Sequence, residues 1–552
     1  MREALREGYT RADLRADLMA GAVVGIVALP LSMALAIASG VPPKHGLYTA
    51  VVAGLLIAAA GGSRVQVSGP TAAFVVILVP ISHNFGIGGL LLASLMAGLL
   101  LVAMGVARLG RMMEFVPYPV TTGFTAGIAV VIGTMQVKDF LGLRVAKMPE
   151  HWVEQLGALF EKAVTARWPE LVISVLALAI LLLFPRFTRK VPAALAALTA
   201  TALVAWIAHA LWPSFSVETI GSRFGGIPQT PPLPVAPWHF PGADGRPLHV
   251  DFALVRALFP SAVAIAILGA IESLLSAVVA DGMSGHRHDP DVELVAQGAG
   301  NIVAPFFGGF AATGAIARTA TSIRAGARSP VASIAHALVV LLAIVLLAPL
   351  LGFLPMAALA ALLLTVAWNM SEREHFIHML RSAPRSDVAV LLTCFALTVL
   401  FDMVVAVTVG VVLAALLFMK RMSEVADFRL VDFHPLGVDP PLPRGVALYE
   451  VAGPLFFGAA QQALRALEDV DPEVRVIIVD LRSVPAMDAT ALVALESAFE
   501  ELEARNVFVI LGGVQPQPLR TMARARWRER RGRVAIYRSF DRAIDQARRA
   551  FA

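Results

Sequence analysis

The chain has 552 residues with a formal net charge of +5, of which 57% are hydrophobic and only 15% are Lys, Arg, Asp or Glu. Soluble domains carry about 25% charged residues, so this composition excludes a soluble globule and is typical of a helical protein that crosses a membrane many times. The charged fraction rises from about 12% before residue 421 to about 27% after it, which predicts a membrane body followed by a soluble domain. Because Cys394 is the single cysteine, an intrachain disulfide is excluded.

The first 420 residues contain fourteen apolar stretches that are long enough, or nearly so, for the ~20 residues that a membrane-spanning helix needs. They cover residues 19–38, 48–60, 71–81, 90–106, 120–135, 171–184, 193–212, 254–280, 294–307, 315–323, 330–350, 355–368, 388–401 and 403–419.

The basic residues between these stretches predict the orientation. With the N-terminus inside, seventeen Lys and Arg residues fall on the cytoplasmic side and nine on the outside, so both termini are expected in the cytoplasm. No cleavable signal peptide is expected, because the polar start runs directly into a long apolar span. We expect a cytoplasmic segment at 1–18, a transport domain at 19–420, a linker at 421–440 and a cytoplasmic domain at 441–552.

Two of the fourteen stretches, 71–81 and 315–323, are short and are interrupted or preceded by Gly and Pro. Each is third in its block of seven, a correspondence that indicates an inverted repeat with a substrate site near the bilayer midplane. The N-termini of two facing half-helices direct backbone N–H groups and positive dipole ends at one place. The pattern therefore predicts transport of an anion.

Glu272 lies in the middle of the eighth stretch among apolar and small residues. An unpaired carboxylate is unfavourable there, which indicates either a protonatable coupling residue or a structural hydrogen bond to a neighbouring helix. Ser276 lies one turn further on the same helical face.

Apart from Arg256 at the very start of the eighth stretch, Arg318 is the one Lys or Arg residue that falls inside a predicted span. Its guanidinium can bind an oxyanion through two hydrogen bonds, which makes it a candidate for the fixed positive charge of the site. The alternatives are snorkelling to the interface or an ion pair with Glu272 or another acid. If Arg318 and Glu272 face one cavity, protonation of Glu272 raises the affinity for the anion.

The C-terminal region alternates strands and a helix, at 475–480, 490–505 and 507–511, which is typical of a small α/β domain. It contains neither a phosphate-binding loop nor a catalytic triad nor a metal-ligand cluster, so no enzyme activity, metal or cofactor is expected. The stretch from Arg520 to Arg538 contains eight arginines and only two aromatic residues, Trp527 and Tyr537, which favours a solvated or lipid-facing surface over binding to nucleic acid.

The sequence resembles the SulP (sulfate-permease-like) anion transporters, bacterial relatives of solute carrier family twenty-six. Four runs carry the resemblance in the membrane body, and two more resemble a STAS domain in the tail. These runs are Val41 to Tyr48, Ser63 to Thr71, Gly269 to Ser273, Gln297 to Asn301 (continuing to Arg318 and Thr319), Val479 to Val484 and Met487 to Thr490.

The resemblance implies a helical membrane fold of seven plus seven inverted segments, divided into core and gate domains (UraA-like), with a cytoplasmic α/β STAS domain. It also implies an elevator-type motion, a homodimer in the bacterial inner membrane and contact with lipid. The anion site of the family corresponds here to Leu31, Leu35, Thr71, Ala72, Ala317 and Arg318.

The cation site of sodium-coupled relatives corresponds to Glu272, Ser276, Gly314, Ala315 and Ile316. Glu replaces Asp at residue 272, and Ile316 stands where a hydroxyl would help to bind a cation, so the sequence favours protons over sodium.

Runs at 41–79, 133–143 and 367–372 resemble the enterobacterial C4-dicarboxylate transporters of the family. We therefore expect proton-coupled uptake of succinate, fumarate, malate or aspartate. Sodium-coupled transport of bicarbonate or sulfate is the alternative, and a membrane sensor that signals through the STAS domain is the second alternative.

Overall fold

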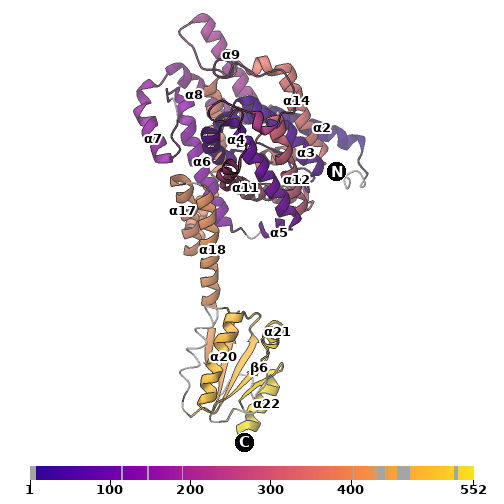
Figure 1. Cartoon of the computed structure of the whole chain (residues 1–552), viewed down its shortest axis with the longest axis vertical. Helices are drawn as coiled ribbons and strands as arrows, with labels where there is room; N and C mark the ends of the chain where they lie inside the picture. The colour runs from indigo at the N-terminus through magenta and orange to yellow at the C-terminus, as the bar shows by residue number, and fades with distance from the viewer. Residues whose placement is uncertain are drawn as a thin grey trace. The chain divides into compact units, whose positions relative to one another are not determined.

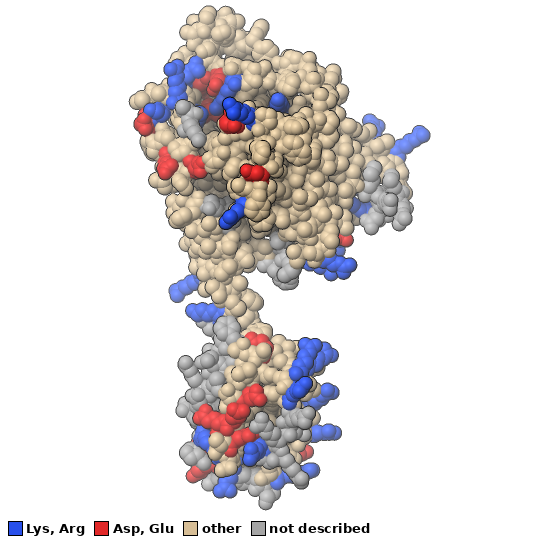
Figure 2. Space-filling model, viewed as in Figure 1, with Lys and Arg blue, Asp and Glu red and all other residues tan. Residues whose placement is uncertain are grey.

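The computed structural model describes residues 8–551 except 114–115, 146–147, 189–190, 402, 426, 432–441, 444, 457–470, 472 and 528–532. The chain divides into two compact units, Met1–Val411 and Val412–Ala552 (Figure 1). Figure 2 shows that most of the visible surface of the first unit is uncharged, whereas the second unit carries many charged side chains.

Each of the fourteen predicted stretches overlaps a helix, which confirms a helical multi-span fold, and nine of the described helices are long and apolar enough to cross a membrane. The helices that overlap the fourteen stretches are thirteen in number: α2 (Arg11–Ala38), α3 (Pro43–Ala60), α4 (Ala72–Val106), α6 (Tyr118–Leu141), α8 (Trp168–Phe187), α9 (Ala193–Leu211), α11 (Phe252–Ser284), α12 (Pro290–Val303), α13 (Ile316–Arg324), α14 (Val331–Leu351), α15 (Met356–Met370), α17 (Arg385–Leu400) and α18 (Met403–Val425).

The first and third stretches differ in extent from the prediction. Helix α2 begins at Arg11 because Thr10 and Asp13 form a capping box, in which each side chain accepts a hydrogen bond from the backbone of the other. The third and fourth stretches share α4 and are separated at Gly86, where φ is 70° and the helix breaks. Glycine adopts this conformation without the steric penalty of a Cβ atom.

The helices of the membrane body pack in two groups. In the core group, α4 packs against α11 and α12, and α14 packs against α2 and α3. In the gate group, α6 packs against α15 and α17, and α8 packs against α9 and α15. The core group contains the first to fourth and the eighth to eleventh predicted stretches, and the gate group contains the fifth to seventh and the last three. Each group therefore takes corresponding stretches from both halves, as an inverted repeat requires.

Glycines allow the helices of the core group to approach closely. A Cβ atom on Gly21 of α2 would lie 2.9 Å from the backbone nitrogen of His336 in α14, and one on Gly98 of α4 would lie 2.7 Å from the backbone nitrogen of Ile302 in α12. Lipid chains are as apolar as the helix side chains, so helices in a membrane gain no hydrophobic stabilisation from associating. Close van der Waals packing supplies the attraction instead, and small residues allow it.

The two broken segments meet at a short strand pair. Strand β1 (Ser68–Gly69) pairs antiparallel with β2 (Thr313–Gly314), and the backbone N–H of Ala315 donates to the carbonyl of Val67 at 2.9 Å. Helix α4 begins three residues after β1, and α13 begins two residues after β2. The two half-helix N-termini therefore lie at one place, as the broken stretches predicted.

The C-terminal unit is the expected α/β domain. Its sheet has the order β3-β4-β5-β6-β7, antiparallel between the first two strands and parallel elsewhere. Helix α20 (Ala489–Ala504) packs on one face and α22 (Phe540–Phe551) on the other. Its further elements are β3 (Asp427–Val431), β4 (Val446–Ala452), β5 (Val476–Ser483), β6 (Phe508–Gly512), β7 (Val534–Ile536) and α21 (Pro516–Arg524).

The range 421–440, predicted as a linker, includes regular structure. Helix α18 continues to Val425 and strand β3 follows it, because this strand finds hydrogen-bonding partners along β4. Residues 432–441 lie outside the described part of the chain, as do residues 1–7 of the predicted N-terminal segment.

Candidate functional site

Arg318 lies in the first turn of α13 against the strand β1, and its side chain is buried with 3% of the residue exposed. Its Nη2 donates to the carbonyl oxygen of Pro70. Nη1 lies against Gly69, where a Cβ atom would be only 2.7 Å away. Within the described part of the chain, Nε and Nη1 are buried and have no hydrogen-bond partner. The guanidinium therefore retains two unused donors.

Thr71 follows Pro70 directly and adds a third donor. Its hydroxyl is buried and has no partner among the described residues. Because Pro70 accepts from Arg318, the hydroxyl and the guanidinium belong to the same small region. Ala72, the first residue of α4, is partly exposed, and Ala317, next to Arg318, is exposed.

The N-termini of α4 and α13 contribute backbone donors. Neither N-cap residue, Thr71 or Ala315, makes a side-chain capping hydrogen bond. The first N–H groups of a helix lack intrahelical partners and carry the positive end of its dipole. The strand pair thus carries a fixed cation, a free hydroxyl and two helix N-termini, an arrangement suited to binding an anion.

Helix α2 forms a further wall, because it packs against both α4 and α13. Leu31, one residue after Pro30, is partly exposed, whereas Leu35 is 2% exposed. These two predicted residues lie on a helix that adjoins the strand pair.

Glu272 lies in α11 and is half-buried. Among the described residues it has no hydrogen bond and no ion pair, so the alternative in which Arg318 pairs with Glu272 is not observed. Ser276, one turn further, is fully buried, and its hydroxyl lies 3.2 Å from that of Thr319. Since residues four apart share a helical face, Glu272 belongs to the side of α11 that faces α13.

The residues predicted for a cation site differ from one another in burial and in hydrogen-bond partners. Gly314 and Ala315 are buried at the end of β2, and the Ser276 hydroxyl is already engaged with Thr319. Ile316 is 39% exposed and presents an apolar side chain. No group of three or more metal-ligating side chains occurs in the described residues.

Polar side chains that hold the strand pair in place were not predicted. The N–H of Val67 donates to Thr319 Oγ1 at 3.0 Å, Gln66 Nε2 donates to the carbonyl of Ser273 at 3.2 Å, and Ser333 Oγ donates to the carbonyl of Gln66 at 2.6 Å. Each of these bonds joins β1 or its preceding residues to a different helix. Together they fix the backbone that carries the site.

A second set of bonds starts from α12. Glu293, 1% exposed, accepts from the N–H of Gly62 at 3.0 Å and from Gln297 Nε2 at 2.9 Å, and the same Nε2 donates to Ser68 Oγ at 3.0 Å. Asn301 binds the backbone of Ala312 through both its amide atoms. Glu293, Gln297 and Asn301 are spaced four residues apart, so their shared face in an otherwise apolar helix was a usable signal.

The polar groups of the C-terminal unit serve its own fold. Arg482 donates three hydrogen bonds to the carboxylate of Asp480, which raise the pKa of Arg482. Asp488 caps α20 by accepting from the N–H of Ala491 at 2.7 Å. These bonds stabilise the sheet end and the helix start, and they resemble no catalytic arrangement.

The fold and the strand pair define a multi-pass membrane protein with a buried guanidinium and two helix N-termini where the two repeats meet. Comparisons with known proteins agree. The sequence profile described as Sulfate permease family matches residues 14–394, and that of the STAS domain matches residues 439–542.

Among relatives, the Putative sulfate transporter YvdB of Bacillus subtilis is 42% identical over 492 residues, covering 89% of this chain and 90% of its own. The Bicarbonate transporter BicA of Picosynechococcus is 29% identical, covering 88% and 86%.

Among solved structures, that of SLC26A9 matches 100% of this chain and 92% of its own with a TM-score of 0.85 at 18% identity. The transmembrane domain of cyanobacterial BicA matches 74% of this chain and 98% of its own, with a TM-score of 0.62 at 26% identity. The chain belongs to the sulfate permease family; it is an anion transporter with a C-terminal STAS domain, and its relatives are transporters rather than enzymes.

Proposed function

We propose that the protein is a proton-coupled secondary transporter in which Arg318 binds the anion and Glu272 carries the proton. The observation that supports the anion site is the pair of buried, unpartnered N–H groups of Arg318. A buried cation without a counter-charge is strongly unfavourable, so an anion that accepts from Nε or from Nη1 stabilises the site. The Thr71 hydroxyl and the first N–H groups of α4 and α13 supply further donors.

Coupling to protons follows from the position of Glu272. An ionised Glu272 on the side of α11 that faces α13 opposes the binding of an anion, and a protonated one does not. Anion and proton therefore bind together and cross together by an elevator-type motion of the core group. Sodium is disfavoured, because the Ser276 hydroxyl is hydrogen-bonded to Thr319 and the side chain of Ile316 offers no oxygen ligand.

For the substrate we propose C4-dicarboxylates: succinate, fumarate, malate or aspartate. The support comes from the runs at 41–79, 133–143 and 367–372, which resemble C4-dicarboxylate transporters. A guanidinium also matches a carboxylate with two parallel hydrogen bonds. We place the protein in a bacterial cytoplasmic membrane as a homodimer surrounded by lipid, with both termini in the cytoplasm.

Sulfate or bicarbonate is the second candidate substrate, with sodium as its coupling ion. It is favoured by the printed names of the relatives YvdB and BicA. Both anions are small oxyanions that Arg318 and two helix N-termini can bind equally well.

The test is uptake by the purified full-length protein in proteoliposomes, with labelled succinate, sulfate and bicarbonate compared under an imposed pH gradient and under a sodium gradient. We expect succinate uptake that follows the pH gradient and does not respond to sodium. Sodium-driven uptake of sulfate or bicarbonate, without succinate uptake, would overturn both the substrate and the coupling ion.

A further inference from the structure

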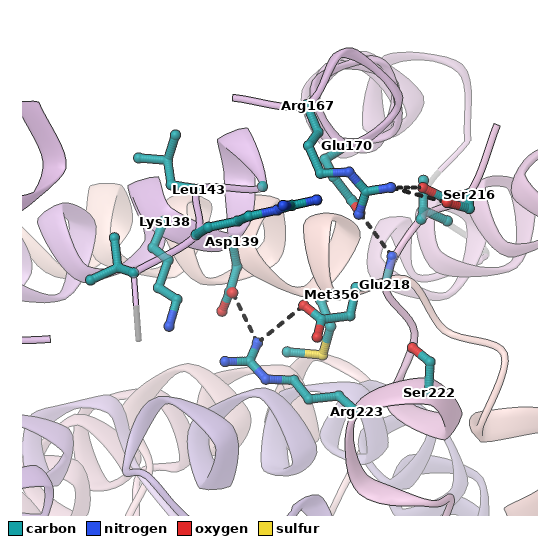
Figure 3. A pocket seen from close by; sticks show the side chains of 14 residues that line it. Lys138, Asp139, Leu143, Arg167, Glu170, Ser216, Glu218, Ser222, Arg223 and Met356 are labelled. Carbon is teal, nitrogen blue, oxygen red and sulfur yellow. Dashed lines mark hydrogen bonds and ion pairs between the residues drawn. The ribbon is translucent and has the colours of Figure 1, made fainter. Parts of the chain in front are cut away.

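A cavity of about 600 Å³ lies in the gate group, away from the strand pair. It is enclosed by the ends of α6 and α8, by the segment around α10 (Ile220–Phe224) and by Met356 of α15 (Figure 3). None of its lining residues belongs to the Arg318 site. Seven of them are charged: Lys138, Arg144, Arg167 and Arg223 against Asp139, Glu170 and Glu218. Figure 2 shows charged side chains gathered on the visible face over α7 (Trp152–Glu161) and α8.

Two of the acids are engaged by Arg223. Its Nη1 lies 2.9 Å from Asp139 Oδ1 and 3.8 Å from Glu218 Oε2, and Figure 3 shows the guanidinium between these two carboxylates. These contacts join α6 to the segment around α10. The carboxylates of Asp139 and Glu218 therefore both face Arg223, a cation of the cavity wall.

The third acid, Glu170, is engaged on the opposite wall. Its Oε1 accepts from Arg167 Nη1 at 3.3 Å and from the backbone N–H of Glu218 at 2.8 Å. Arg167 also donates from Nη2 to the carbonyl and hydroxyl of Ser216, at 2.6 and 3.0 Å. The wall formed by Arg167 and Glu170 is thus held by its own hydrogen bonds.

Lys138 and Arg144 are the remaining cations. Neither side chain has an ion pair or a hydrogen bond to another described residue. They flank the turn that ends α6, where the N–H of Leu143 donates to the carbonyl of Lys138 at 2.8 Å and Gly142 has a φ of 64°. Lys138 is half-buried and Arg144 is exposed. The turn therefore presents two uncommitted cations to one cavity.

The balance of charge selects the ligand. Among the lining residues that the structure describes, four basic against three acidic side chains leave one excess positive charge. A singly charged anion neutralises this excess, whereas a dianion reverses it. The ammonium of Lys138 and the guanidinium of Arg144 are both donors without acceptor capacity, and they suit the oxygen atoms of a carboxylate.

We propose that this cavity is a second anion site, which binds a small singly charged oxyanion such as bicarbonate or a monocarboxylate through Lys138 and Arg144. The site goes beyond the transport proposal, because binding here does not require Arg318. The positively charged cavity raises the local concentration of monoanions at one end of the gate group.

The experiment is isothermal titration of the full-length protein in detergent, in an Arg318→Ala background that removes the proposed transport site. The probes are acetate, bicarbonate and sulfate. We expect acetate and bicarbonate to bind, and sulfate to bind about tenfold more weakly or not at all.

Two substitutions locate the binding. Lys138→Gln and Arg144→Gln should each weaken acetate binding by about tenfold, since each removes a charge-assisted hydrogen bond. Lys162→Gln is the matched control, because Lys162 is an exposed lysine paired with Glu161 outside the cavity, and it should bind acetate like the parent. Lys138→Arg keeps the positive charge that Lys138→Gln loses, so it should bind acetate with most of the affinity of the parent protein. Arg144 is exposed, so its variant remains informative even if Lys138→Gln unfolds.

The proposal is overturned if the Arg318→Ala protein binds neither acetate nor bicarbonate, or if Arg144→Gln binds acetate like Lys162→Gln. Equal affinity for sulfate and acetate overturns the charge argument. The transport proposal is judged separately by flux through the wild-type protein in proteoliposomes, so binding without flux refutes transport and leaves this site in place.

Discussion

The two broken segments of the membrane body have the same backbone plan and different chemistry. In each, a two-residue strand leads within three residues into a helix, and the strands pair with each other, Ser68 with Gly314 and Gly69 with Thr313. The first segment offers the hydroxyl of Thr71, whereas the second offers the guanidinium of Arg318. The repeat thus supplies two helix N-termini by symmetry, and a single residue of one repeat, Arg318, supplies the fixed charge.

The segments also differ in how they are held. The first accepts hydrogen bonds from Gln297 and Ser333 and donates one to Thr319, and these three residues belong to three helices of the second repeat. Arg318 in turn donates to Pro70 of the first. Each repeat therefore positions the site residues of the other, so the site depends on the contact between them. Four substitutions test how the two segments differ and depend on each other, and they are given from the largest expected effect to the smallest.

Arg318→Ala should lower anion uptake at least about 30-fold, because removing one member of a buried charge pair costs about 2 to 5 kcal/mol. Initial rates of uptake into proteoliposomes measure the effect. Arg324→Ala is the control, since Arg324 is an exposed arginine in the last turn of the same helix and should leave uptake within about twofold. Similar rates for the two variants would place the anion elsewhere.

Glu272→Gln should transport without responding to a pH gradient, because glutamine resembles the protonated carboxyl and cannot release a proton. In the wild type, uptake should rise as the outside is acidified, since protonation of Glu272 favours binding of the anion. Rates with and without the gradient measure the loss of coupling. Glu154→Gln, on exposed helix α7, should keep the full response. A pH response that survives in Glu272→Gln would assign the proton to another group.

Gly69→Ala should weaken the apparent affinity for the anion by about tenfold, because the new methyl group would lie 2.7 Å from Arg318 Nη1 and displace the guanidinium. The concentration dependence of uptake gives this affinity. Gly133→Ala is the matched control, since its nearest neighbour would be 3.9 Å away, and it should behave like the wild type. An unchanged affinity in Gly69→Ala would show that Nη1 does not contact the anion.

Thr319→Val should lower the free energy of unfolding by about 1 to 3 kcal/mol, because it leaves the buried N–H of Val67 without an acceptor. Denaturation in detergent, followed by circular dichroism, measures it. Thr321→Val on the same helix removes only a bond to the preceding turn, to Ala317, and should change stability by less than about 0.5 kcal/mol. Equal stabilities would mean that β1 is held without Thr319.

Composition and periodicity predicted the fourteen segments, because apolar stretches of the required length are visible without any knowledge of packing. The meeting of the broken segments was also predictable, since both contain Gly and Pro at corresponding positions. Arg318 and Glu272 stood out because charges are rare in the surrounding sequence, and the structure places both on helices that pack against each other. Their roles in binding and coupling stay predictions.

Other features were not predicted. Arg318 donates to the backbone carbonyl of Pro70, and any residue supplies such a carbonyl, so this partner depends on the three-dimensional pairing of β1 and β2. The start of α2 at Arg11 depends on the local capping box of Thr10 and Asp13, which outweighs the polarity of its first turns. The cavity beside Lys138 joins residues up to 218 positions apart in the chain, from four separate elements.

The most direct test of the account is a structure of the wild-type protein with bromosuccinate bound, in which anomalous scattering locates the bromine atom. We predict bromine density beside the β1–β2 pair, with a carboxylate within hydrogen-bonding distance of Nε or Nη1 of Arg318 and of the Thr71 hydroxyl. Ligand density at another place in the membrane body, with the Arg318 guanidinium still without an anion, would contradict the central claim that this arginine binds the transported anion.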